Sequence, residues 1–177
     1  MYQPRTYRYW IKSDNLVSFN VTVKETDLCI RAAIDLSRKA RKSVFKYRNL
    51  LESYIQHHPE FITSLEPLEV GQDAPIIIKD MARSTAKVGV GPMAAVAGAI
   101  AEFVGKELLP FTADLIIENG GDIFLRSRIK RTIGIYAGSS PLSGKIGLEI
   151  EGGNTPLGIC TSSGTIGHSL SFGKADA

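Results

Sequence analysis

The sequence predicts an α+β fold in which helices pack on one face of a mostly antiparallel sheet. Apolar residues recur at helical spacing over residues 27–57, and a second stretch, 92–108, is rich in alanine and glycine. From residue 113 onward, short β-rich segments alternate with turn-rich links, a pattern typical of an antiparallel meander. The length of 177 residues and the hydrophobic fraction of 44% suffice for one well-buried domain spanning 1–177.

The N-terminal third predicts a hairpin followed by a long amphipathic helix. Residues 7–11 and 16–23 alternate and are rich in aromatic and β-branched side chains, so they are expected to pair. Thr26 or Asp27 is expected to cap a helix over 27–57, which the proline at position 59 ends.

The middle third predicts a strand over 76–79 and then a helix that starts at Pro92 and continues to residue 108. Glycines and alanines give this helix a small face that allows close packing. The glycines before it, Gly89 and Gly91, allow two interpretations. Either they pack tightly, or they expose backbone N–H groups to an anion. Four polar residues just upstream suit the second interpretation, namely Arg83, Ser84, Thr85 and Lys87. The strands expected after the helix are 113–118, 122–127, 131–137, 145–151, 157–161 and 166–172.

Charge and cysteine content exclude several classes of protein. The net charge is +3, but residues 1–60 alone carry 11 Lys and Arg against six Asp and Glu. This excess is interpreted as a solvated helix face and not as a nucleic-acid site. The side chains expected to be exposed on it are those of Arg38, Lys39, Arg41, Lys42 and Lys46. Cys29 and Cys160 are far apart, which disfavours a disulfide scaffold or a zinc site.

Hydropathy predicts a protein without a membrane partner. No apolar run approaches the ~20 residues of a membrane helix. The first ten residues lack the hydrophobic core of a signal peptide. The expected location is therefore the cytoplasm.

Residues 118–122, Glu-Asn-Gly-Gly-Asp, stand between two predicted strands. Asn119 and Gly120 suit the central positions of a tight hairpin turn, since both need positive φ. A second glycine followed by an acid is left unexplained. Two successive positions without side chains allow close approach of a phosphate or of another backbone, whereas a hairpin with a glycine bulge is the structural alternative.

The C-terminal stretch is rich in hydroxyl groups. Thr161, Ser162, Ser163 and Thr165 surround Gly164 and precede His168. Such a loop can donate hydrogen bonds to phosphate or ribose oxygens at little steric cost. A well-hydrogen-bonded surface turn is the alternative interpretation.

Taken in order, the small-residue helix, "ENGGD", "CTSSG", "GHS" and "KADA" resemble the ApbE-like superfamily over residues 76–177. Its best-known members are FAD:protein FMN transferases. The resemblance implies FAD or FMN and Mg²⁺ as cofactors and an acceptor protein as partner, and it is compatible with a homo-oligomer. It implies flavin-nucleotide contacts from Gly120, Gly121, Asp122, Thr161, Ser162, Ser163, Gly164 and Thr165, a catalytic role for His168, and magnesium ligation by Asp176.

The departures from the family pattern leave the function open. The segment "GHSLSFG" keeps His168 but lacks the family's Asp-Pro-x-Thr-Gly, and the sequence stops one residue after Asp176, so the domain is expected to be incomplete at its C-terminus. One hypothesis is Mg-dependent transfer of FMN from FAD, with His168 as general base. The alternative is a flavin- or nucleotide-binding protein without transferase chemistry. A hydrolase using Ser162 or Ser163 is least favoured, because the Gly-x-Ser-x-Gly elbow is missing.

Overall fold

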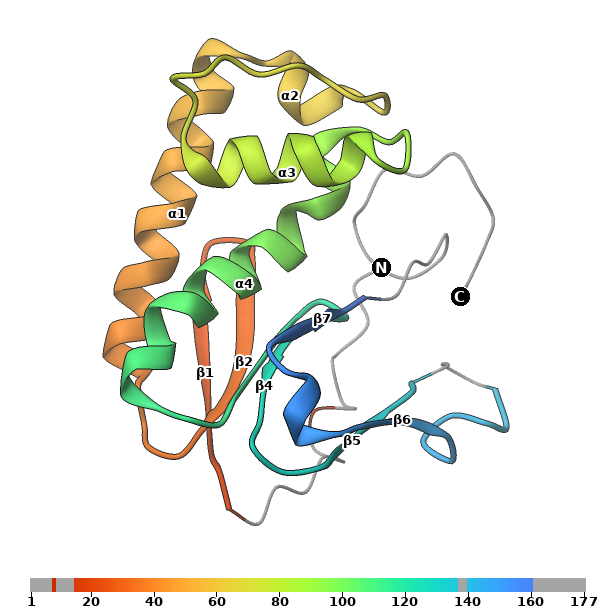
Figure 1. The fold of residues 1–177 in the computed structure, drawn as a ribbon. Coiled ribbons are helices and arrows are strands. Elements are labelled where there is room, and N and C mark those ends of the chain that lie inside the picture. The colour runs from red at the N-terminus through yellow and green to blue at the C-terminus, as the bar shows by residue number, and fades with distance from the viewer. Residues whose placement is uncertain (1–7, 9–14, 137–139, 161–177) are drawn as a thin grey trace.

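The computed structural model describes residue 8, residues 15–136 and residues 140–160, and it confirms the α+β class (Figure 1). Its five-stranded sheet has the order β1-β2-β3-β4-β7, with every neighbouring pair antiparallel. The strands are β1 (Val17–Val23), β2 (Thr26–Ala32), β3 (Leu115–Asn119), β4 (Asp122–Arg126) and β7 (Leu157–Ile159). The mostly antiparallel sheet is therefore confirmed, while the strand expected over 166–172 lies outside the described residues.

The helices gather on one face of this sheet (Figure 1). Helix α1 contacts β1, and α4 contacts β3 and β4, while α2 and α3 pack further out against these helices and against η2. The helices are α1 (Ser37–His57), α2 (Glu60–Thr63), α3 (Ile76–Ala86) and α4 (Val96–Leu108), with short 3₁₀ turns η2 (Pro92–Ala95) and η3 (Leu109–Phe111) on either side of α4.

The core lies between the helices and the sheet. Leu28, Ile30 and Ala32 of β2 alternate toward the helices and are all 0% exposed. Val44 of α1 and Val104 of α4 cover them from above and are equally buried. Each fully buried Leu, Ile or Val of this kind contributes about 1.5–3 kcal/mol.

Two of the strands expected after residue 113 leave the main sheet. β5 (Arg131–Gly134) and β6 (Gly147–Ile150) form a separate two-stranded ribbon, and η4 (Gly152–Asn154) leads back to β7. The ribbon has no fully buried residue, so it lacks an apolar face that could pack onto the sheet. Instead β1 and β2 complete the sheet.

The expected helix over 27–57 begins ten residues too early. Residues Thr26–Ala32 form β2, and α1 starts at Ser37, where the Asp35 carboxylate accepts the Ser37 N–H at 2.8 Å. Strand β2 is central and buried on both faces, so its residues do not show a clear alternation. The spacing between Ile30 and Ile34 imitated a helix, but Ile34 is 53% exposed. The partner strand expected over 7–11 lies outside the described residues, apart from Arg8.

The expected strand over 76–79 is also wrong, because these residues open α3. Pro75 sits at its N-cap, and the buried side chains of Ile77, Ile78, Met81, Ala82 and Thr85 recur at helical spacing. A window of four residues rich in isoleucine does not distinguish a strand from the start of a buried helix. Tertiary packing decided in favour of the helix.

Other expectations are confirmed. The five basic side chains of α1 that were expected to be exposed, those of Arg38, Lys39, Arg41, Lys42 and Lys46, are exposed. Both described cysteines are free, Cys29 buried and Cys160 exposed. Among the helices of the described ranges, none has the length and apolar character needed to cross a membrane.

Candidate functional site

The turn between β3 and β4 is built from two glycines. Asn119 pairs with Asp122 in the register, so Gly120 and Gly121 occupy the central positions, with φ of +66° and +109°. Both angles lie in the region that favours glycine. The expectation that Asn119 is a central residue is thus wrong by one position. The second glycine has a structural reason, since the turn itself needs it.

The two acids that flank this turn point to opposite faces of the sheet. Glu118 pairs with Ile123, whereas Asp122 pairs with Asn119 on the face that α4 covers. Side chains of successive residues in a strand alternate between faces. A single site formed by both carboxylates is therefore excluded, and Asp122 alone belongs to the helix side.

Asp122 lies against the first turn of α4. The backbone N–H of Gly98, the third residue of the helix, donates a hydrogen bond to its carboxylate. A Cβ on Gly98 would lie 3.3 Å from Asp122 Oδ2, so only a glycine allows this approach without displacement. Asn119 Nδ2 donates to the Ala97 carbonyl at 3.0 Å and fixes the turn to the same helix end. Residues far apart in sequence thus form one corner beside the bare turn.

The environment of Asp122 raises its pKa from 3.8 to about 6. The main cause is loss of water around the half-buried carboxylate, with a smaller contribution from the negative charge of Glu118, and the Gly98 N–H opposes both. The folded chain therefore holds this proton more tightly than the unfolded chain does. A carboxylate kept in an unfavourable environment beside a turn is typical of functional sites.

Asp122→Asn is expected to stabilise the protein at neutral pH. Between pH 4 and about 6 the unfolded carboxyl loses its proton while the folded one keeps it, so wild-type stability falls as pH rises through this window. Asparagine keeps the acceptor for Gly98 but carries no charge. Partial exposure reduces the effect, and we expect a gain of about 1 kcal/mol at pH 7.5 that vanishes below pH 4. Urea unfolding of both proteins across this pH range measures it. A pH-independent difference would contradict the assignment.

The opposite face holds a separate ionic network. Arg8 Nε donates to Glu118 Oε2 at 2.6 Å, and Arg8 NH1 donates to Asp27 Oδ2 at 2.8 Å. Burial alone would lower the pKa of Arg8, but the two carboxylates outweigh it and raise that pKa. Glu118 Oε1 also accepts the Gly121 N–H at 3.2 Å. Glu118 thus supports the turn from below.

The C-terminal part of the expected site begins at the same end of the sheet. Ile159 of β7 pairs with Ile123 of β4, so Cys160 follows at the level of Asp122. The described part of the chain ends there. The remaining predicted site residues lie outside the described residues: Thr161, Ser162, Ser163, Gly164, Thr165, His168 and Asp176.

The two glycines before α4 donate their N–H groups within the chain, Gly89 to the Ala86 carbonyl, and Gly91 also packs tightly. Gly91 donates its N–H to the Leu65 carbonyl at 2.9 Å, and a Cβ on Gly91 would lie 1.9 Å from the Ser64 carbonyl oxygen. Thr85 is buried and donates to the Met81 carbonyl. The packing interpretation is confirmed for Gly91, whereas Gly89 stands in open space with a φ of +73°.

The donor set for a metal is incomplete in this part of the chain. Across residue 8, 15–136 and 140–160, no group of three His, Cys, Asp or Glu side chains is placed to hold an ion. Asp122 supplies a single carboxylate, because Glu118 faces the other way.

Comparison with known proteins identifies the family to which the chain belongs. The sequence profile of the family described as AbpE bacteria matches residues 8–177. The chain belongs to this family. The β3–β4 turn and the end of β7 both lie within the part of the chain that matches this family.

Relatives of this AbpE bacteria protein carry the name UPF0280 protein. The one from Methanococcus aeolicus is 42% identical over 166 residues, which are 92% of this chain and 67% of the relative. The one from Methanopyrus kandleri is 45% identical over 164 residues, 92% of this chain and 66% of the relative. The one from Methanothermobacter thermautotrophicus is 50% identical over 131 residues, which are 73% of this chain and 50% of the relative. The chain thus spans about two thirds of the length of the first two.

Sequence reasoning missed the contact of Gly98 with Asp122, the hydrogen bond from Asn119 to the Ala97 carbonyl, and the role of Arg8. Gly98 and Gly105 lie seven residues apart on one helix face and meet Asp122 and Phe124, two residues apart on one strand face. The small face of the helix was visible in the sequence, but the strand residues that it meets were not. The role of Arg8 carried no comparable signal, because it depends on contacts with distant strands.

Proposed function

We propose that the chain binds a flavin nucleotide, or a related nucleotide, at the corner formed by the β3–β4 turn and the start of α4. One observation carries this proposal. The half-buried Asp122 carboxylate is held by Gly98 directly beside two positions that have no side chain. The glycines let a ligand approach the backbone, and the carboxylate offers an acceptor whose water is already partly removed.

Asp122 is the orienting group in this proposal. A carboxylate in a dehydrated corner accepts hydrogen bonds from a sugar hydroxyl or a ring N–H more strongly than it does in water. The hydroxyl-rich residues after Cys160 would supply donors to the phosphates. The position of Cys160 at the level of Asp122 supports this arrangement.

Membership of the ApbE-like superfamily is part of the same proposal. The order of the motifs and a family name that echoes ApbE support it. Mg-dependent transfer of FMN from FAD to an acceptor protein is the stronger form of the proposal, and it depends on His168 and Asp176. His168 and Asp176 lie outside the described residues, so nucleotide binding at Asp122 is the part of the proposal that the described geometry supports.

Gly120→Asn is expected to weaken FAD and FMN binding at least tenfold, or about 1.4 kcal/mol. Asparagine tolerates the φ of +66° at this position, so the side chain is added without unfolding the turn. A Gly121→Val variant is unsuitable for this test, because the φ of +109° at that position would strain the backbone of a valine. Flavin fluorescence titrations with and without Mg²⁺ measure binding, and release of AMP from FAD measures transfer.

Gly89→Asn is the matched control. Gly89 has a φ of +73°, and a Cβ there would meet no atom within 4 Å. The affinity of the Gly89→Asn variant for flavin should equal that of wild type. The proposal fails if wild type binds neither FAD nor FMN, or if Gly120→Asn binds them as tightly as the control does.

A further inference from the structure

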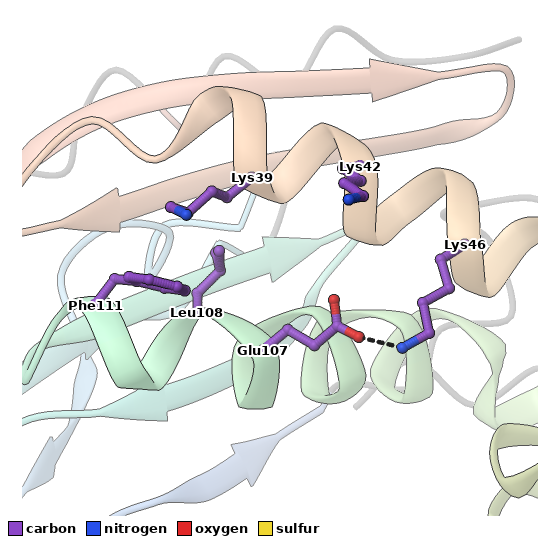
Figure 2. Close-up of a pocket in the computed structure, with 6 residues that line it drawn as sticks. All are labelled: Lys39, Lys42, Lys46, Glu107, Leu108 and Phe111. Atoms are coloured by element: carbon purple, nitrogen blue, oxygen red, sulfur yellow. Dashed lines mark hydrogen bonds and ion pairs between the residues drawn. The ribbon is translucent and has the colours of Figure 1, made fainter.

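A hollow lies at the other end of α4, away from the corner at Asp122. It has a volume of about 450 Å³ and opens between α1 and the end of α4 (Figure 2). We call it the lysine hollow, and its lining residues are Lys39, Lys42, Lys46, Glu107, Leu108 and Phe111. The three lysines project from one side of α1, while the other three residues come from α4 and η3 (Figure 2).

The three ammonium groups have different surroundings. Lys46 forms an ion pair with Glu107 at 2.5 Å, and this contact raises the lysine pKa. Lys39 Nζ lies 3.9 Å from the centre of the Phe111 ring. Lys42 has no hydrogen-bond or ion-pair partner among the described residues. The lining therefore carries two positive charges beyond those that Glu107 neutralises.

The surrounding charges add to this excess. Arg38 and Arg41 lie in the first two turns of α1, the same part of the helix that carries Lys39 and Lys42, and the first turn contains no acidic residue. Cations near a helix N-terminus are unfavourable because the backbone already contributes partial positive charge there. The partial negative charge at the C-terminus of α4 offsets the partial positive charge at the N-terminus of α1. The carboxylate of Asp35 compensates one further positive charge. An unfavourable concentration of cations remains, and a bound anion would relieve it.

The hollow also has an apolar wall. Phe111 lies across from Lys39 and is 48% exposed although it is large and aromatic, whereas Leu108 beside it is 1% exposed and packs in the core. A volume of this size falls within the range of small-molecule sites. The combination suits a ligand with an anionic group at one end and an apolar group at the other.

We propose that the lysine hollow binds a small phosphate-bearing molecule. Its phosphate lies between Lys39 and Lys42, and its apolar part rests on the exposed ring of Phe111. A phosphate dianion matches two ammonium groups in charge. The Glu107 carboxylate closes one end of the lysine row and would repel an extended polyanion, which favours a small ligand over a nucleic acid. This site is independent of the corner at Asp122.

The test uses three probes on the ¹⁵N-labelled chain: inorganic phosphate, phenyl phosphate and phenol. Amide shifts measured by two-dimensional NMR should change along the first half of α1 and over residues 107–111. Phenyl phosphate should bind more tightly than inorganic phosphate, phenol should not bind measurably, and added salt should weaken both phosphates. Lys42→Gln should weaken phenyl phosphate binding about tenfold, the loss of one hydrogen bond to a charged group.

Lys87→Gln is the matched control, because it removes the same charge from an exposed position at the end of α3. It should leave the affinity unchanged. Phe111→Ala should remove the advantage of phenyl phosphate over inorganic phosphate. Equal losses in the two lysine variants, or shifts elsewhere only, would overturn the proposal. Binding of a DNA duplex or of anionic vesicles that is tighter than phenyl phosphate and lost in Lys42→Gln would also overturn it in favour of a macromolecule.

Discussion

Glu118→Ala is expected to lower the free energy of unfolding by about 3 kcal/mol. Glu118 and Arg8 form a pair whose side chains are only 7% and 12% exposed, with Nε and Oε2 2.6 Å apart. Removing one partner leaves the other charge without its counter-ion in a region from which water is largely excluded, and such losses reach about 3–5 kcal/mol. Asp27 still pairs with Arg8, which places the expected value at the lower end. Urea unfolding followed by circular dichroism measures the change.

Glu149→Ala serves as the comparison. Its ion pair with Lys130 joins two side chains that are 64% and 48% exposed. The loss should stay below about 0.5 kcal/mol. Similar losses for the two variants would show that the Glu118 pair is no stronger than one on the surface.

Gly105→Ala is expected to destabilise the protein by about 2 kcal/mol, although alanine favours helices. A Cβ on Gly105 would lie 2.3 Å from Cδ1 of Phe124, and that ring is only 5% exposed. Overpacking of this kind costs about 1–3 kcal/mol, occasionally more, and the gain in helix propensity returns about 1 kcal/mol. Thermal and urea unfolding give the net value.

A double variant separates overpacking from other causes. Phe124→Leu replaces the ring with a smaller side chain. The loss in free energy of unfolding caused by Gly105→Ala should therefore be smaller in that background than in wild type. Gly134→Ala, where a Cβ would meet no atom within 4 Å, controls for loss of glycine flexibility. An unchanged cost in the double variant would show that the clash is not with Phe124.

The sequence predicted the C-terminal half of the fold better than the N-terminal half. The strands after residue 113 are short and separated by turn-rich links, so local patterns locate them, although β7 pairs with β4 across the intervening β5–β6 ribbon, which the sequence did not predict. Strand β2 is different, since both of its faces are buried by partners from elsewhere in the chain: Arg8 below and α1 with α4 above. Its pattern therefore lost the alternation that identifies a strand.

The candidate site was predicted in part for a similar reason. The glycine turn and Asp122 were visible as a motif, because a tight hairpin constrains neighbouring residues. The separation of Glu118 and Asp122 onto opposite faces follows from any two-residue turn between them, because paired residues share a face and neighbours along a strand alternate. The contact with Gly98 required the packing of a helix onto that strand, and no local pattern specifies it.

The sheet order has a consequence for the entropy of folding. Strands β2 and β3 are neighbours, yet residues 33–114, which contain all four α-helices, lie between the paired Ala32 and Leu115. The hairpins β1–β2 and β3–β4 each close across two residues, whereas this single pairing must close a loop almost half the length of the chain. The entropic penalty rises by about 0.6 kcal/mol for each doubling of loop length. Every contact that forms early between α1 and α4 shortens the effective loop, so the helical layer lowers the barrier to joining the two halves of the sheet.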